Sequence, residues 1–233
     1  MSGDRAEALA VLHAEVDACR RCAIGSTRTK VVCGVGDPEA RLVIIGEGPG
    51  ENEDRIGAPF VGRAGELLTK MLAAIDLRRE DVFITNTIKC RATLVDQGRI
   101  KNRAPMQEEL ANCRPYLDRE LAIVEGKIIL ALGAPAAKTF LGPSFSITRQ
   151  RGIWYTGPGG VDLMVTFHPA YILRLTGGEM NAVKKLVYAD LLAVRERLDA
   201  MAQAAESPGP DNAGKSPNDE QSAHAAQLTF GDL

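Results

Sequence analysis

The sequence predicts an α/β fold of three layers, α/β/α, in which helices cover both faces of a central, mainly parallel four-stranded sheet. Short apolar runs, rich in β-branched residues, predict buried strands at residues 41–46, 81–88, 127–133 and 161–167. Helical patterns separate these runs, and strands that alternate with helices are typical of an open parallel sheet. Ligands of such sheets bind beyond the carboxyl ends of the strands, so we expect a functional site at that edge.

Apolar residues that recur every three or four positions predict the helices. Leu9, Leu12 and Val16 give this spacing near the start of the chain. Pro105, followed by two glutamates, is typical of a helix start, and Asn181 is a suitable cap for the last long helix. The expected helices comprise about residues 5–18, 64–75, 105–124, 136–141 and 181–198.

Length and composition predict one globular domain, residues 1–200, followed by an acidic tail, residues 201–233. The tail holds five acidic residues against Lys215 alone and is rich in Ser, Pro, Gly and Asn, so we expect it to be disordered. Residues 1–200 carry 27 basic and 25 acidic side chains, a net charge of +2. This balance permits DNA binding without demanding it.

The chain is expected to be cytoplasmic. Its N-terminus mixes acids into the apolar positions, unlike an export signal, and no stretch approaches the roughly 18 apolar residues of a membrane span. We therefore expect no membrane partner and a monomer. In a reducing compartment five cysteines indicate metal or redox chemistry rather than disulfides.

Four of the cysteines could hold a metal: the C-x-x-C pair Cys19 and Cys22, then Cys90 and Cys113. A pair of this kind also occurs in thiol redox motifs and zinc sites, although zinc sites more often show two close pairs. Four thiolates also suit a 4Fe-4S cluster, and the remaining alternative is unrelated buried cysteines. Cys33 lies among valines and is interpreted as that last case.

The most specific motif is the loop GEGPGENEDRIGAPFVGRAG, residues 46–65, which matches neither common phosphate-binding glycine pattern. Three further motifs follow in the chain: NTIKC (residues 86–90), NRAP (102–105) and TFHPAYILR (166–174). Together these motifs closely resemble the family 4 uracil-DNA glycosylases, and the likeness extends from about residue 17 to residue 198.

The resemblance implies an enzyme that flips uracil out of single- or double-stranded DNA and hydrolyses its N-glycosidic bond, which starts base excision repair. It also implies that a 4Fe-4S cluster is held by the cysteines at positions 19, 22, 90 and 113. In this reaction uracil leaves as an anion while the sugar becomes cation-like. The pocket therefore needs a stacking surface, a reader of the base edge and a group that stabilises the departing anion.

The resemblance also assigns these roles to individual residues. Phe60 matches the stacking aromatic, and Asn86 the amide that reads uracil O4 and N3–H. His168 matches the histidine that bonds uracil O2, and Glu47 the carboxylate that organises water or stabilises the sugar cation. Gly46 and Glu53 complete the expected substrate-binding set, with Glu53 near uracil C5.

The expected DNA contacts lie in two segments. Leu173 resembles the wedge that fills the hole left by the flipped base, and Arg174 is placed to contact phosphate. Arg91, Arg99, Lys101 and Arg103, beside Lys89, form a basic strip that could follow the DNA backbone, although an isolated charge run is more often a solvated loop.

The chain departs from the family in the segment between Cys90 and Asn102, which is longer than the short proline-rich link of family 4. A related branch carries a basic loop here with a histidine that captures the sugar covalently. Asn102 occupies that position in this chain, so we expect turnover. A non-turnover or covalent uracil-DNA binder and a non-catalytic iron-sulfur DNA-binding module are the alternatives.

The end of the tail suggests one further partner. Gln227, Leu228 and Phe230, within residues 227–233, loosely resemble peptides that dock on the replication sliding clamp. The spacing of the leucine and phenylalanine differs from that of such peptides, and an arbitrary apolar tail end is the alternative.

Overall fold

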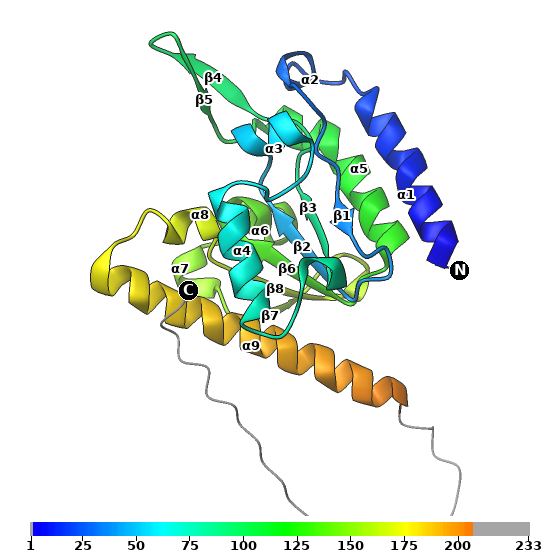
Figure 1. Ribbon diagram of the computed structural model, residues 1–233, viewed down its shortest axis with the longest axis vertical. Coiled ribbons are helices and arrows are strands. Elements are labelled where there is room, and N and C mark those ends of the chain that lie inside the picture. Colours follow the sequence, from blue (N-terminus) through cyan, green and yellow to red (C-terminus); the bar gives the residue numbers. More distant parts are fainter. Residues whose placement is uncertain (1, 207–233) are drawn as a thin grey trace, which may run out of the picture.

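The computed structural model describes residues 2–206, which form a central sheet with helices on both of its faces (Figure 1). This arrangement confirms the α/β class with a mainly parallel sheet. The six strands lie in the order β1-β3-β2-β6-β8-β7. Their bounds are β1 Val35–Gly36, β2 Leu42–Gly46, β3 Phe83–Asn86, β6 Ile128–Leu132, β7 Trp154–Thr156 and β8 Asp162–Thr166.

The prediction of four strands was wrong, because the sheet has six. The four predicted strands form its parallel centre, β3-β2-β6-β8. Two strands that the sequence did not predict, β1 and β7, pair antiparallel at the two edges. They span only two and three residues, too few to show a period-two pattern.

Alternate residues of the central strands point to opposite faces and build two separate cores. Leu42 and Ile44 of β2 pack into the core beneath α4 and α9, whereas Val43 and Ile45 pack into the core beneath α1, α5 and α6. The helices are α1 Ser2–Asp17, α2 Ile24–Thr27, α3 Glu51–Ile56, α4 Arg63–Ala73, α5 Gln107–Val124, α6 Gly133–Leu141, α7 Ile147–Gln150, α8 Pro169–Ile172 and α9 Gly177–Glu206.

The last helix is longer than expected at both ends. α9 begins at Gly177, so Asn181 lies inside the helix and does not cap it. It continues to Glu206, and residues 201–206, which the sequence assigned to the tail, are therefore helical. The rest of the predicted tail, including the expected clamp contact at residues 227–233, lies outside the described residues.

The segment after Cys90 forms an antiparallel hairpin of its own, β4 Thr93–Asp96 and β5 Arg99–Asn102. Figure 1 shows it projecting from the body of the protein. The backbone N–H of Arg103 donates to the carbonyl of Ala92 across its base, at 3.0 Å. The lengthened segment of the sequence is thus an ordered ribbon.

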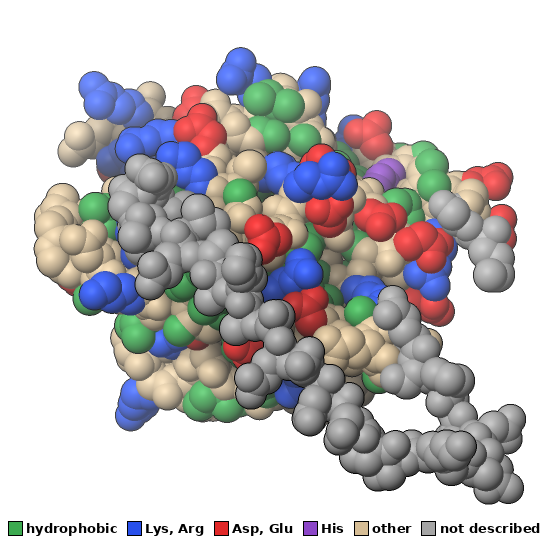
Figure 2. Space-filling view, turned by 60° about the horizontal axis from the view of Figure 1, so that its bottom comes forward, with side chains coloured by type: hydrophobic (Ala, Val, Ile, Leu, Met, Phe, Trp, Pro, Cys, Tyr) green, Lys and Arg blue, Asp and Glu red, His purple; other side chains and the backbone are tan. Residues whose placement is uncertain are grey.

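None of the helices in the described part of the chain combines the length and the apolar character that a membrane crossing requires. On the face seen in Figure 2, basic and acidic side chains are interspersed. This mixture agrees with the small net charge of the folded domain.

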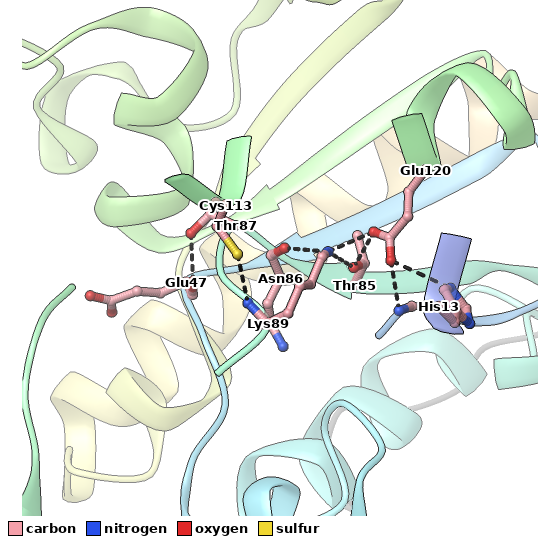
Figure 3. A network of polar contacts seen from close by, with 9 residues as sticks. His13, Glu47, Thr85, Asn86, Thr87, Lys89, Cys113 and Glu120 are labelled. Atoms are coloured by element: carbon pink, nitrogen blue, oxygen red, sulfur yellow. Dashed lines mark hydrogen bonds and ion pairs between the residues drawn. The ribbon is translucent and has the colours of Figure 1, made fainter. Parts of the chain in front are cut away.

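A buried ion pair connects the segment after β3 to α5 (Figure 3). The Lys89 ammonium lies 2.6 Å from a carboxylate oxygen of Glu120, and both side chains are fully buried. Lys89 also donates to the hydroxyl of Thr85 and to the carbonyl of Asn86, while Glu120 accepts from the backbone N–H of Gly34. The prediction that Lys89 belongs to a surface basic strip was therefore wrong.

The pKa of Glu120 indicates that this carboxylate stays charged although it is buried. Burial alone raises the pKa of a carboxyl, but the Lys89 ammonium and hydrogen bonds from its neighbours lower that of Glu120 to about 2. Because this pKa is depressed from an ordinary value of 4.5, the carboxylate contributes stability above pH 4.5 that is lost as the pH falls towards 2.

We expect Lys89→Met to lower the free energy of unfolding by about 3–5 kcal/mol, because it leaves the Glu120 carboxylate buried without its cation. The double variant Lys89→Met with Glu120→Leu should regain much of that loss, since no charge then remains unpaired. Urea unfolding of the variants measures both values. Asp199→Asn, which breaks the exposed Arg195–Asp199 pair, is the control and should have a far smaller effect. An equally small loss for Lys89→Met would contradict the assignment.

Candidate active site

A cavity of about 670 Å³ lies where β2, β3 and β8 end, at the carboxyl edge predicted for the site. It is lined by segments that are far apart in the sequence, from the glycine-rich loop, the end of β3, the base of the hairpin and the start of α8. Eight of the predicted site residues line it: Glu47, Glu53, Phe60, Asn86, Asn102, Arg103, His168 and Arg174.

Gly46 is required for the close approach of two of these side chains. A Cβ atom on Gly46 would lie 2.4 Å from Oδ1 of Asn86 and 2.6 Å from Cζ of Phe60, both closer than real contacts allow. Gly46 is also hydrogen-bonded into the sheet beside Asn86. A residue with no side chain at the end of β2 therefore lets the amide and the aromatic ring meet at the floor of the cavity.

Phe60 adopts a backbone conformation that is uncommon for a residue with a side chain, with φ at +53°. Hydrogen bonds on both sides of it hold this conformation. Arg79 donates to the carbonyl of Pro59, and the backbone N–H groups of Val61 and Gly62 donate to Glu53 at 2.9 Å each. Strain that is held in this way is typical of functional loops.

Glu53 thus has a structural role as a hydrogen-bond acceptor within the protein. One of its carboxylate oxygens accepts both backbone N–H groups of the Phe60 loop. The neighbouring Asp54 is buried and accepts from the backbone N–H of Thr29. Asp54 is therefore a buried structural acceptor rather than a solvated charge, while the expected contact of Glu53 with uracil C5 stays a prediction.

The ring of His168 is stacked with that of Phe60, at a centroid distance of 5.6 Å and an interplanar angle of 26°, and both residues line the cavity. Its Nδ1 accepts a hydrogen bond from the backbone N–H of Ala170 at 3.0 Å, which leaves the proton on Nε2. Burial, together with the positive charge of Arg174, lowers the pKa of His168 to about 4. At neutral pH the ring is an uncharged hydrogen-bond donor.

Glu47 is fixed through its backbone, and its side chain is directed away from the Lys89–Glu120 network (Figure 3). The carbonyl of Glu47 accepts from the hydroxyl of Thr87 and from the backbone N–H of Ile88. Burial raises the pKa of its carboxyl, which lines the cavity. This places a carboxylate of increased basicity beside the predicted base pocket.

The predicted DNA contacts border the cavity or lie next to it. Asn102, Arg103 and Arg174 line its rim, whereas Leu173 is exposed at the end of α8 and Arg91 lies behind Asn102. Nε of Arg91 donates to Oδ1 of Asn102 at 2.7 Å, so these two side chains act together.

Most members of the predicted basic strip already have acidic partners. Arg103 forms an ion pair with the buried Glu109, and Lys101 pairs with Asp96. Their charges are partly neutralised within the protein. Fewer basic side chains are therefore available to bind the DNA backbone than the sequence indicated.

The four predicted cysteine ligands occupy two adjoining apolar clusters that share Cys113. Cys19 and Cys113 pack around Leu12 and Val16, while Cys22, Cys90 and Cys113 pack around Ile88.

A different group of side chains brings possible metal ligands closest together. Among the described residues, the only group of three or more His, Cys, Asp or Glu ligand atoms within 4.8 Å of one another is His13, Cys33 and Glu120. Glu120 is already bonded to Lys89, so this group belongs to the ion-pair network; Cys33 is buried, as predicted.

Hydrogen bonds reach two of the sulfurs. The backbone N–H of Lys89 donates to Sγ of Cys113 at 3.3 Å, and the Arg28 guanidinium donates to Sγ of Cys90 at 3.4 Å. Arg28 also donates to the carbonyl of Cys19. Arg28 was not among the predicted site residues, because its position directly after the four-residue helix α2 gives no signal of this role in the sequence.

Comparisons with known proteins agree with this geometry. Residues 33–192 match the model of the uracil DNA glycosylase superfamily. The chain is 41% identical to the type-4 uracil-DNA glycosylase of Thermotoga maritima over 80% of this chain and 93% of the relative. It is also 41% identical to that of Archaeoglobus fulgidus, over 72% and 84%.

A more distant relative is the type-5 uracil-DNA glycosylase of Thermus thermophilus, 31% identical over 59% of this chain and 68% of the relative. Because the superfamily model covers most of the domain and the type-4 relatives match nearly their whole length, the chain belongs to the type-4 uracil-DNA glycosylases of the uracil DNA glycosylase superfamily.

Proposed function

We propose that this protein removes uracil from DNA by hydrolysing its N-glycosidic bond, as the first step of base excision repair. The observation that carries the proposal is the position of Phe60, Asn86 and a neutral His168 around one cavity at the carboxyl edge of the sheet. Membership of the family supports the same reaction. We infer that the protein acts as a monomer in the cytoplasm on single- or double-stranded DNA.

Recognition of the base follows from the shape and polarity of the cavity. A flipped uracil can stack on the Phe60 ring, which the strained loop holds in place. The Asn86 amide can donate to O4 and accept from N3–H, a pattern that cytosine does not offer. We propose that the hydrogen bond from the Lys89 ammonium to the backbone carbonyl of Asn86 keeps this amide in position.

Cleavage of the glycosidic bond places negative charge on uracil and positive charge on the sugar, and each charge needs a group that stabilises it. As the C1′–N1 bond breaks, its electron pair moves into uracil, and the Nε2–H of His168 can donate to the oxygen that gains negative charge. The Glu47 carboxylate can stabilise the cation-like sugar and accept a proton from the water that adds to C1′. The products are free uracil and an abasic site.

We expect Asn86→Ala and His168→Ala each to lower kcat/KM for uracil excision by about 10²–10³-fold, because each removes a group that acts mainly in the transition state. The free energy of unfolding should change little by comparison. Excision is measured on a uracil-containing oligonucleotide by alkaline cleavage of the abasic product. Thr148→Ala, which also lines the cavity but has no assigned role, is the control.

Two outcomes would contradict the proposal. Loss of stability in parallel with loss of activity would indicate a structural role for Asn86 and His168. A denaturant-stable complex between the wild-type protein and uracil DNA, without release of uracil, would favour the covalent alternative; the position of Asn102 at the cavity is the observation that keeps this alternative open.

The pH dependence should separate the two catalytic groups. Because the pKa of His168 is lowered to about 4, it stays neutral through the weakly acidic range and should give no inflection near 6.5. The acid limb of kcat/KM should instead follow Glu47, whose pKa lies above its ordinary value of 4.5. NMR titration of the imidazole carbons, assigned with His168→Gln, measures the first value. A His168 midpoint near 6.5 would contradict the neutral-donor role.

We also propose that Cys19, Cys22, Cys90 and Cys113 hold a 4Fe-4S cluster. The four side chains come from three separate segments and lie in two adjoining apolar clusters that share Cys113, which supports one common site for four thiolates. Donors to the sulfurs of Cys90 and Cys113 favour thiolate ligands. When bound, the cluster would cross-link the N-terminal segment, the segment after β3, and α5.

Anaerobically purified protein should be brown and contain about four iron atoms per chain. Cys113→Ser should lower the iron content and the visible absorbance, whereas Cys33→Ser, in the neighbouring ion-pair network, should leave both unchanged. Metal analysis and absorption spectroscopy measure the two values. Zinc at one atom per chain, or equal iron loss in both variants, would contradict this assignment.

A further inference from the structure

The hairpin β4–β5 has a firmly held base next to the cavity. The guanidinium of Arg103 donates to the carbonyl of Thr93 and forms a bidentate ion pair with the buried Glu109 of α5. Ala92, Asn102 and Arg103, at this base, all line the cavity. The direction in which the hairpin leaves the domain is therefore fixed relative to the base pocket.

Strand pairing decides which hairpin residues share a face. Residues directly opposite in an antiparallel pair point to the same side, and the side alternates along each strand. The pairs Thr93–Asn102 and Val95–Ile100 therefore share one face. Leu94–Lys101 and Asp96–Arg99 share the other. The side chain of Asn102 is directed at the glycine-rich loop of the cavity, because a Cβ atom on Gly50 would lie 3.8 Å from its Nδ2. Val95 and Ile100 therefore extend that cavity-side face outward.

The two faces differ in chemistry. Val95 is 74% exposed and Ile100 64% exposed, and they form a directly paired apolar patch. On the opposite face, Lys101 and Asp96 form an ion pair at 2.7 Å beside the charged Arg99, and the one apolar residue, Leu94, is 42% exposed. Two β-branched side chains at the end of a projecting ribbon gain little from folding, since a two-stranded hairpin has no core to bury them in. Their position on the cavity side points to a ligand that also enters the cavity.

We propose that the Val95–Ile100 patch contacts the bases and sugars of DNA that flank the flipped nucleotide. The inference rests on the proposed function. It commits to DNA because the patch continues the face of Asn102, which lines the cavity, and because Tyr171 and Arg174 line the same cavity next to the exposed Leu173. Apolar side chains that pack against unstacked bases are a known means of holding distorted DNA. The DNA strand that carries uracil thus contacts both the hairpin and the start of α8.

The test compares apolar-to-hydroxyl changes on the two faces. The double variant Val95→Thr with Ile100→Thr removes the apolar patch while it keeps β-branched side chains and adds no charge. Leu94→Thr, on the opposite face, is the matched control. Binding is measured by fluorescence anisotropy on an oligonucleotide with 2′-fluoro-2′-deoxyuridine, whose glycosidic bond resists cleavage, and excision is measured on the same sequence with deoxyuridine.

We expect the double variant to weaken binding about tenfold and to raise KM with kcat nearly unchanged, because the patch lies outside the catalytic groups. The control should bind like the wild type, and circular dichroism should show the same melting temperature for all three proteins. Unchanged binding in the double variant, or equal weakening in the control, would overturn the proposal and leave the patch for a protein partner. The binding comparison decides this point even if the wild type releases no uracil, a result that would instead contradict the proposed function.

Discussion

The architecture of the site depends on one buried ion pair. Lys89 sits in the turn that follows β3, and Glu120 sits in α5; the chain that joins them contains the hairpin and two of the predicted cluster ligands. Because both charges are fully buried, neither can be left without the other at small cost. The pair therefore fixes the distance between the central sheet and α5. It also connects the two proposed sites, since Lys89 donates from its ammonium to the Asn86 carbonyl and from its backbone to the Cys113 sulfur.

The base pocket is held mainly through the backbone. Glu53 accepts two N–H groups of the loop around Phe60, and the missing side chain of Gly46 makes room for the ring and the Asn86 amide. His168 is oriented by the backbone N–H of Ala170 at the start of α8. Contacts of this kind order a pocket before a ligand arrives, so little binding energy is lost in arranging the proposed catalytic groups.

Sequence reasoning recovered the parts of the fold that have a local signature. The parallel strands and long helices follow from periodicity, and the loop motifs identified Asn86, Phe60 and His168, which the structure brings to one cavity. It failed where the position of a residue depends on contacts with distant parts of the chain. Lys89 looked like one more surface cation, because nothing near it in sequence indicates that Glu120 lies against it. The strands β1 and β7 were too short to detect, and the hairpin turns at Gln97 and Gly98, both with positive φ, a weaker signal than Asn-Gly.

The hairpin illustrates how a long insertion can be added beside an active site without disturbing it. The two ends of the ribbon are joined by the backbone bond from Arg103 to Ala92, and the Arg103–Glu109 ion pair ties that junction to α5. The chain therefore leaves and re-enters the domain at nearly one point, so the residues between can vary in length at little cost in loop entropy. Cys90 lies just before this junction, and Asn102, the last residue of the ribbon, lines the cavity. An insertion placed there extends the surface next to the base pocket, while the ion pair holds the base of the insertion against α5.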